Sequence, residues 1–231
     1  MQKKIITILA FVGIILFIYT LYKIDPLVIW QTIKRVTWSK FMLLILMRLI
    51  YWCLRTVNWK IILSKYEIKT SFLQTFRARL AGHAISYLTP SAKFGGEAVR
   101  VLMLKRENKK KILASVIIDK TIELMSTVLF AFIGVIVAVI IIYMPSTLRM
   151  VLIFSAVASI VFFAFIFKKQ KNGFFLWLID SMKKIKIRFK FLERNREKIK
   201  ETDVYISSFY NENKKTFLYI FILYIVEMII W

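Results

Sequence analysis

Five apolar runs constrain what this chain can fold into. They cover residues 5–22, 39–57, 113–143, 148–167 and 216–231. The hydrocarbon core of a bilayer is about 30 Å thick, and a helix needs about 20 apolar residues to cross it. Because backbone polar groups in lipid must be satisfied within the chain itself, runs of this kind form helices. We therefore predict an all-α polytopic integral membrane protein with about five spanning helices.

The charge of the chain favours a membrane location over binding of nucleic acid. The 231 residues are 59% hydrophobic and carry a formal net charge of +23, from 36 basic and 13 acidic residues. A nucleic-acid-binding protein accounts for the charge but not for the apolar runs. A membrane protein accounts for both when the basic residues lie in loops on one side. We expect one membrane domain, residues 1–231, in the cell (plasma) membrane.

Two strongly basic segments set the expected orientation. Segment 58–111 holds twelve basic and three acidic residues, and segment 168–215 holds fourteen basic and six acidic residues. Lysine and arginine accumulate in cytoplasmic loops. We therefore place both segments and the N-terminus in the cytoplasm and residues 144–149 outside. The basic segment 168–215 is predicted to be an amphipathic hairpin of solvated helices near anionic headgroups.

Residues 23–40 fit this orientation poorly, because they carry four basic residues on the predicted outer side. Asp25 and Pro26 are typical of a helix start, and Leu27, Trp30 and Ile33 follow at helical spacing. This pattern predicts a short interfacial helix with its tryptophan at headgroup level.

The stretch YLTPSAKFGGEAVR, residues 87–100, gathers backbone breakers and charges of both signs. It lies within 70–104, which has no uninterrupted apolar run of spanning length and is expected to begin and end in the cytoplasm. Non-helical backbone at membrane depth persists only where protein or a water-filled cavity satisfies it. We therefore predict a re-entrant hairpin over 70–104, with an ordinary cytoplasmic loop as the alternative.

The second half of this stretch has features that suit an anionic ligand. Gly95 and Gly96 allow close approach of the backbone, and free NH groups at the start of the next helix attract anions. Glu97 and Arg100 lie on one face of that helix. Lys93 adds a second cation.

Charged residues inside the apolar runs form a second group of candidates. Arg48 lies near the centre of the second run, and Arg55 follows seven residues later, where it can snorkel to the interface. Asp119 and Glu123 lie on one face of the third run. Each buried charge costs about 2.5–3.5 kcal/mol or more and usually faces a partner or a cavity. We expect Arg48 to face the third-run carboxylates.

Two interpretations of these charges stay open, and both can hold together. In one, the charges neutralise each other and fix helix packing. In the other, they line a hydrated path for a lipid headgroup along Arg48, Glu97, Arg100, Asp119 and Glu123. Glu227 in the last run is a further acid to which the sequence assigns no role.

Several motifs resemble the transmembrane family of lysylphosphatidylglycerol synthases. Pro90, Gly95, Gly96, Glu97 and Arg100 resemble its P-x-x-x-G-G-E-x-x-R signature, with one more residue after the proline. RTVNWKIIL, residues 55–63, resembles the end of the family's second span. SVIIDKTIELM, residues 115–125, resembles the start of its next long helix, where Asp-Arg is usual. Here Lys120 follows Asp119, which keeps the charge but loses the guanidinium fork.

The resemblance covers about residues 1–231 and implies the N-terminal part of a longer domain, so we expect the chain to be C-terminally incomplete relative to the family. It implies a flippase-like lipid translocase whose partners are membrane lipids with anionic or amino-bearing headgroups. The candidate headgroup-path residues are Arg48, Pro90, Lys93, Gly95, Gly96, Glu97, Arg100, Asp119, Lys120 and Glu123.

Two other functions stay open. One is a membrane subunit that presents lipid to a separate aminoacyl- or glycosyltransferase, and the other is a non-catalytic scaffold. The sequence carries no catalytic or nucleotide-binding motif, and one cysteine with one histidine makes no Cys/His metal site. We expect no enzyme activity, metal or cofactor. A homo-oligomer is left open.

Overall fold

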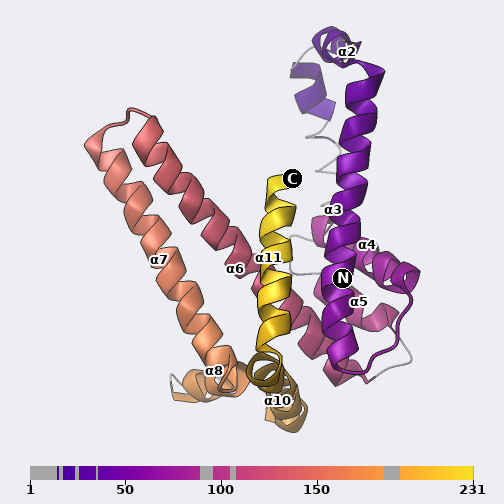
Figure 1. Cartoon of the computed structure of the whole chain (residues 1–231), viewed down its shortest axis with the longest axis vertical. Coiled ribbons are helices and arrows are strands. Elements are labelled where there is room, and N and C mark those ends of the chain that lie inside the picture. Colours follow the sequence, from indigo (N-terminus) through magenta and orange to yellow (C-terminus); the bar gives the residue numbers. More distant parts are fainter. Residues whose placement is uncertain are drawn as a thin grey trace. The chain divides into compact units, whose positions relative to one another are not determined.

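The computed structural model of this protein describes residue 15 and residues 18–23, 26–34, 36–88, 96–104, 108–184 and 193–230. Within these ranges the labelled elements are all helices (Figure 1). They are α2 (Pro26–Lys34), α3 (Trp38–Lys65), α4 (Phe72–Leu88), α5 (Gly96–Met103), α6 (Lys109–Ile141), α7 (Ser146–Gln170), α8 (Phe174–Lys184), α10 (Arg196–Glu212) and α11 (Lys214–Ile230). The all-α prediction is confirmed for the described residues.

The contacts divide the chain into two compact units, Met1–Ile50 and Tyr51–Trp231, with the boundary inside α3. In the first unit, α2 begins at Pro26 as the sequence predicts, because proline is favoured in the first turn of a helix. Its interfacial position stays a prediction, as does the single membrane domain. The apolar run 5–22 lies largely outside the described residues.

Three helices in the described part of the chain are long and apolar enough to cross a membrane, namely α3, α6 and α7. They correspond to the predicted spans 39–57, 113–143 and 148–167. The run 216–231 forms α11, whose 17 residues extend about 25 Å at 1.5 Å per residue. That length is below the hydrocarbon thickness, so its role as a span stays a prediction.

Local capping explains where several helices begin. Asn108 accepts hydrogen bonds from the backbone NH groups of Lys110 and Lys111 at the start of α6. Ser71 and Gln74 form a reciprocal capping box before α4, with bonds of 3.2 and 3.1 Å. Gly173 has a φ of 89° and ends the turn before α8, a conformation that favours glycine.

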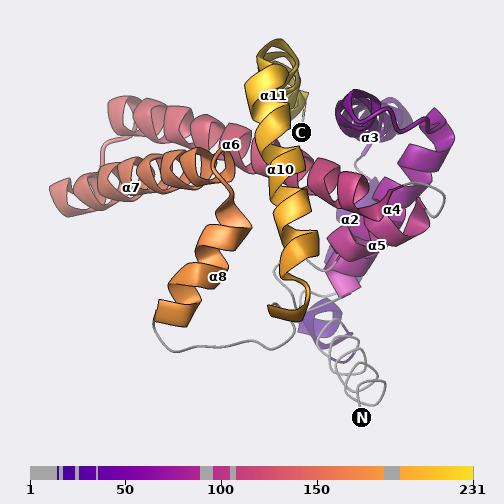
Figure 2. The same ribbon diagram turned by 90° about the horizontal axis from the view of Figure 1, so that it is seen from below.

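Helices α6 and α7 form a long antiparallel pair, which runs side by side in Figure 1 and in the perpendicular view of Figure 2. In the apolar stretches of α6 and α7 that are long enough to span a membrane, 6% and 0% of the residues are buried, respectively. Exposed apolar surface of this extent marks contact with lipid or with other apolar partners. This part of the second unit therefore suits the hydrocarbon core.

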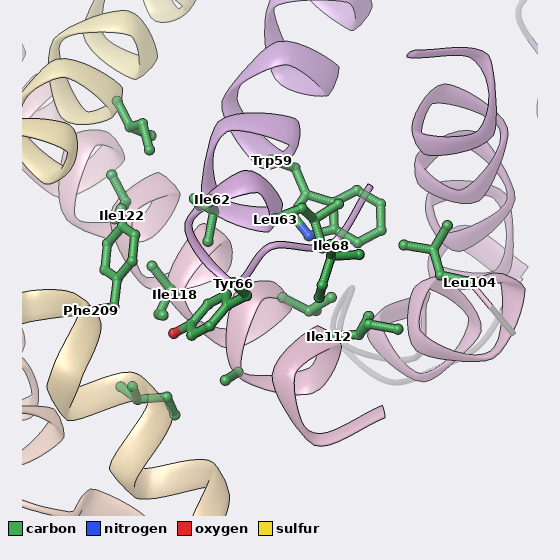
Figure 3. Packing of buried hydrophobic residues seen from close by; sticks show 14 of the residues in the cluster. Trp59, Ile62, Leu63, Tyr66, Ile68, Leu104, Ile112, Ile118, Ile122 and Phe209 are labelled. Carbon is green, nitrogen blue, oxygen red and sulfur yellow. The ribbon is translucent and has the colours of Figure 1, made fainter. Parts of the chain in front are cut away.

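The buried core lies at the other end of α6 (Figure 3). There Ile112, Ile118 and Ile122 belong to one cluster with Trp59 of α3 and Phe209 of α10. Fully burying side chains of this size contributes about 1.5–3 kcal/mol each. The cluster therefore joins α3, α6 and α10 at this end of the second unit.

The basic segment 168–215 is more than the solvated hairpin that its charge predicts. Its helices α8 and α10 pack together, and α10 also packs on α6, with Ile206, Phe209 and Tyr210 at most 2% exposed. These residues recur at three- and four-residue spacing among dense charges, so one face of α10 is apolar. Asp203 from the same face accepts bonds from the backbone NH groups of α8's first turn at 3.2 and 2.8 Å.

Candidate functional site

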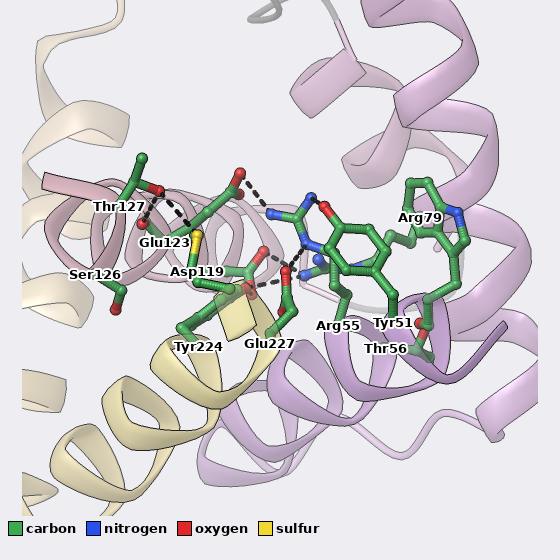
Figure 4. A network of polar contacts seen from close by, with 12 residues as sticks. Tyr51, Arg55, Thr56, Arg79, Asp119, Glu123, Ser126, Thr127, Tyr224 and Glu227 are labelled. Atoms are coloured by element: carbon green, nitrogen blue, oxygen red, sulfur yellow. Dashed lines mark hydrogen bonds and ion pairs between the residues drawn. The ribbon is translucent and has the colours of Figure 1, made fainter. Parts of the chain in front are cut away.

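A buried network of charged side chains joins five helices of the second unit (Figure 4). Its members are Arg55 of α3, Arg79 of α4, Arg100 of α5, Asp119 and Glu123 of α6, and Tyr224 and Glu227 of α11. Because α6 carries two of the three carboxylates four residues apart, one face of this helix organises the site.

Asp119 is the centre of the network and is fully buried. Its Oδ2 atom accepts hydrogen bonds from Arg79 Nη2 at 2.5 Å and from Arg100 Nη2 at 2.7 Å. Its Oδ1 atom accepts one from Tyr224 Oη at 2.5 Å. Charge-assisted bonds of this length are about twice as strong as neutral ones. One carboxylate therefore holds two arginines, each less than 7% exposed.

Trp59 forms an aromatic wall beside these arginines. The guanidinium carbon of Arg100 lies 4.0 Å from the centre of the Trp59 ring, which is a favourable cation–π distance. The indole Nε1 donates a hydrogen bond to Ser115 Oγ at 3.1 Å. Ser115 lies one turn before Asp119 on α6, so the tryptophan is fixed by the same polar face that carries the carboxylates.

The crossing of α4 and α5 explains why Arg79 and Arg100 converge. A Cβ atom added to Gly96 would lie 1.8 Å from the carbonyl oxygen of Gly82, so the two backbones touch at this point. The Gly96 NH donates to Ser86 Oγ at 2.9 Å. Gly96 therefore serves close helix packing, and its NH is not the free anion donor that the sequence predicts.

Arg55 occupies the side of the network toward the end of α11. Its Nη2 atom lies 2.5 Å from Glu123 Oε1, its Nε lies 3.1 Å from Glu227 Oε1, and its Nη1 donates to Tyr51 Oη at 3.0 Å. Lys120 adds a second cation at 3.2 Å from Glu123 Oε1. Lys120 thus contributes an ammonium group to the ion pairs of the network, where arginine would contribute a guanidinium fork.

The described network has more cations than carboxylates. Four basic side chains, Arg55, Arg79, Arg100 and Lys120, meet three acids. The excess lies at Asp119, where two guanidinium groups share one carboxylate. The Nε atoms of Arg79 and Arg100 are buried and make no hydrogen bond to any described residue. A buried cation with spare donors attracts an anion that offers acceptor oxygens.

Among the candidate path residues, the structure brings Arg100 to Asp119 and Lys120 to Glu123, and their role in a headgroup path stays a prediction. Glu97, in the first turn of α5, joins none of these ion pairs, although its Oε2 atom is buried and makes no bond to a described residue.

Arg48 is exposed and belongs to the first unit. The arginine that contacts Glu123 is Arg55, one heptad later, and the predicted pairing of Arg48 stays a prediction. Pro90, Lys93 and Gly95 lie outside the described residues.

Sequence reasoning missed Arg79 and Tyr224 and underrated Arg55 and Glu227. A signal for Arg79 was available: Thr75, Ala78, Arg79, Gly82 and Ser86 recur at helical spacing and are all buried. An arginine on a stripe of small residues faces a neighbouring helix rather than lipid. Tyr224 and Glu227 lie three residues apart on α11, on the face that the last apolar run presents to α6.

Within the described ranges no group of three histidine, cysteine or carboxylate residues lies close enough to hold a metal ion.

Comparison with known proteins shows one family. The family described as "Lysylphosphatidylglycerol synthase TM region" matches residues 5–231. The UPF0104 membrane protein PH1989 of Pyrococcus horikoshii is 28% identical over 206 residues, which cover 78% of this chain and 60% of that protein. The chain therefore spans about 60% of the length of this curated relative. No solved structure matches.

Proposed function

Because the chain belongs to the lysylphosphatidylglycerol synthase transmembrane-region family, we propose that it moves an anionic phospholipid, or a lipid-linked phosphate headgroup, between membrane leaflets. The observation that carries this proposal is the sharing of Asp119 by Arg79 and Arg100. A phosphodiester supplies one negative charge and oxygen acceptors, which match the excess charge and the guanidinium donors that make no hydrogen bond to a described residue.

The burial of the arginine pair favours a transported ligand over a purely structural role. Arg79 and Arg100 are 4% and 6% exposed. A structural ion pair needs one cation for one carboxylate, whereas a second buried guanidinium adds several kcal/mol of desolvation without a second counter-ion among the described residues. A headgroup phosphate supplies that counter-ion. Because the arginines are enclosed, the headgroup reaches them only when the surrounding helices separate, as alternating access requires.

The apolar surface of α6 and α7 supports the same function. In their apolar stretches only 6% and 0% of the residues are buried, so acyl chains can lie against these helices while the headgroup enters the polar network.

The test is lipid movement in vesicles of phosphatidylcholine and phosphatidylglycerol that contain the full chain and fluorescent phosphatidylglycerol. Quenching of the label in the outer leaflet measures its exchange between leaflets. Loss of a hydrogen bond to a charged group removes about 1.5–3 kcal/mol. We therefore expect Arg79→Gln and Arg100→Gln to slow lipid movement about 10- to 100-fold.

Arg77→Gln is the matched control, because Arg77 lies on the same helix as Arg79 but is exposed. A fluorescent glucosylceramide, which has no phosphate, is the control for the headgroup. Equal slowing by Arg77→Gln, or equal movement of the glycolipid, would contradict the phosphate site. A wild-type protein that moves no lipid would instead favour a subunit that presents lipid to a transferase.

A further inference from the structure

Glu227 is the acid of the network whose surroundings differ most from those of the other two. It is 1% exposed, and neither carboxyl oxygen accepts a hydrogen bond from any described residue. By contrast, Asp119 accepts three charge-assisted or hydroxyl bonds. A buried carboxylate without donors is costly in its charged form.

Arg55 is placed between two acids on two different helices (Figure 4). Its contact with Glu123 of α6 is short, at 2.5 Å, whereas its Nε lies 3.1 Å from Glu227 Oε1 without the alignment of a hydrogen bond. The guanidinium is held in this position by Tyr51. The closer ion pair of Arg55 is therefore the one with Glu123. Its attraction to Glu227 is an electrostatic contact that protonation of Glu227 would remove.

The charged and titratable groups around Glu227 come from four of the five helices that form the network. They are Arg55 and Tyr51 of α3, Arg79 of α4, Asp119 and Glu123 of α6, and Tyr224 on α11 itself. Helix α10 meets α11 near Phe217, nearly three turns before Glu227. These charges belong to the same network as the arginine site, which consists of Arg79 and Arg100 around Asp119.

We propose that Glu227 binds a proton when a phosphate headgroup enters the arginine site, so that each lipid moves together with one proton. This proposal rests on the lipid movement proposed above. The negative charge of the headgroup engages the excess cation at Asp119, which leaves less positive charge to stabilise ionised Glu227. The proton comes from water, and the product is a neutral carboxylic acid.

Thermodynamic linkage makes this coupling reciprocal. If phosphate favours the protonated form of Glu227, protonation favours phosphate to the same degree. Uptake of one proton raises the affinity for the headgroup up to about tenfold for each unit of pH lowered. One negative headgroup and one proton carry no net charge, so the coupled movement responds to a pH gradient but not to a membrane potential.

The first measurement is infrared difference spectroscopy of the full chain in dodecyl maltoside, a detergent without a carbonyl group. The probe is sn-glycerol phosphate, which also has none. We expect the wild type to gain a protonated-carboxyl band when the probe is added at neutral pH and also when the pH is lowered without it. Glu227→Gln should lose both bands. Glu201→Gln, an exposed glutamate paired with Lys110, should keep both.

The second measurement repeats the vesicle assay with fluorescent phosphatidylglycerol under an imposed pH gradient or an imposed potassium potential. We expect net movement of the wild-type substrate toward the less acidic side, up to about tenfold biased for each pH unit, and no response to the potential. Glu227→Gln should lose the response to pH and gain one to the potential, because the headgroup then moves with its charge alone.

The outcomes separate the two proposals. If the wild type moves no lipid, the translocase proposal fails, and the band from lowered pH alone still decides whether Glu227 takes up a proton. If lipid moves but ignores the pH gradient, or if Glu227→Gln keeps either the band or the pH response, the coupling proposal is overturned while the translocase proposal stands. A variant that loses its size-exclusion profile is replaced by Glu227→Asp, which should keep the band.

Discussion

Replacing Asp119 by asparagine tests whether one carboxylate holds the network together. The amide keeps the size of the side chain and one acceptor oxygen, but it removes the negative charge between Arg79 and Arg100. Their Nη2 atoms lie 2.5 and 2.7 Å from the same oxygen. The substitution therefore leaves two neighbouring buried guanidinium groups without their counter-ion.

The expected loss of stability follows from these contacts. With charge centres about 4 Å apart and an effective dielectric constant of about 20, each pair contributes on the order of 4 kcal/mol before desolvation. Removing one partner of a buried ion pair costs about 3–5 kcal/mol, and we expect Asp119→Asn to lie at the upper end because it breaks two pairs. Arg100→Gln leaves Asp119 paired with Arg79 and Tyr224, so it should cost only about 1–3 kcal/mol.

The assay is thermal unfolding of the full chain in detergent, followed by tryptophan fluorescence. For a protein of this size, 1 kcal/mol corresponds to about 2–4 °C, so Asp119→Asn, at about 5 kcal/mol, should lower the midpoint by about 10–20 °C. The double variant Asp119→Asn, Arg100→Gln should unfold later than the sum of the two single losses predicts. The coupling energy should be about 0.5–3 kcal/mol, because removing Arg100 relieves the repulsion that Asp119→Asn creates.

Two results would refute this reasoning. One is an Asp119→Asn variant that is no less stable than Arg100→Gln. The other is an additive double variant, which would mean that the two side chains act independently and that their 2.7 Å contact carries little energy.

Three further predictions concern packing, capping and orientation. Gly96→Ala should lower the unfolding midpoint by about 2–12 °C, because its Cβ atom would clash with the backbone of Gly82. Gly134→Ala is the control, because its Cβ atom would meet nothing within 4 Å, and it should leave the midpoint unchanged or raise it. Equal effects of the two substitutions would reject the helix crossing. Asp203→Ala should lower the free energy of unfolding by about 1–2 kcal/mol, because two backbone NH groups of α8 lose their acceptor. The same thermal assay measures this loss, and an unchanged midpoint would argue against the cap. In a Cys53→Ser background, which removes the exposed native thiol, Ser146→Cys should react with an impermeant maleimide from outside intact cells, and labelling from the cytoplasm alone would reverse the predicted orientation.

The local features of this protein follow from its sequence because they depend on near neighbours. The apolar runs predict α3, α6 and α7, since a run of that length satisfies its backbone in lipid only as a helix. Pro26 marks the start of α2. The four-residue spacing of Asp119 and Glu123 places both on one face of α6, and the high energy of a charge in hydrocarbon directs that face inward.

Contacts between distant segments were decided by the tertiary structure alone. Tyr224 donates to Asp119 across 105 residues of chain, and no local pattern links a tyrosine in one apolar run to an acid in another. The Gly96 NH shows the same limit, because a helix start predicts a free donor until a neighbouring helix brings Ser86 within 2.9 Å.

The contact between Arg55 and Glu123 likewise depends on the tertiary structure. Arg48 and Arg55 lie on the same face of one helix, two turns and about 10 Å apart, so helical periodicity treats them alike. The tertiary structure places the Arg55 Nη2 atom 2.5 Å from Glu123 Oε1, a contact that helical periodicity does not predict. The energy of an ion pair depends on the distance between its charges in space. The sequence therefore determines which residues carry the charges and on which face, whereas helix packing determines which charges meet.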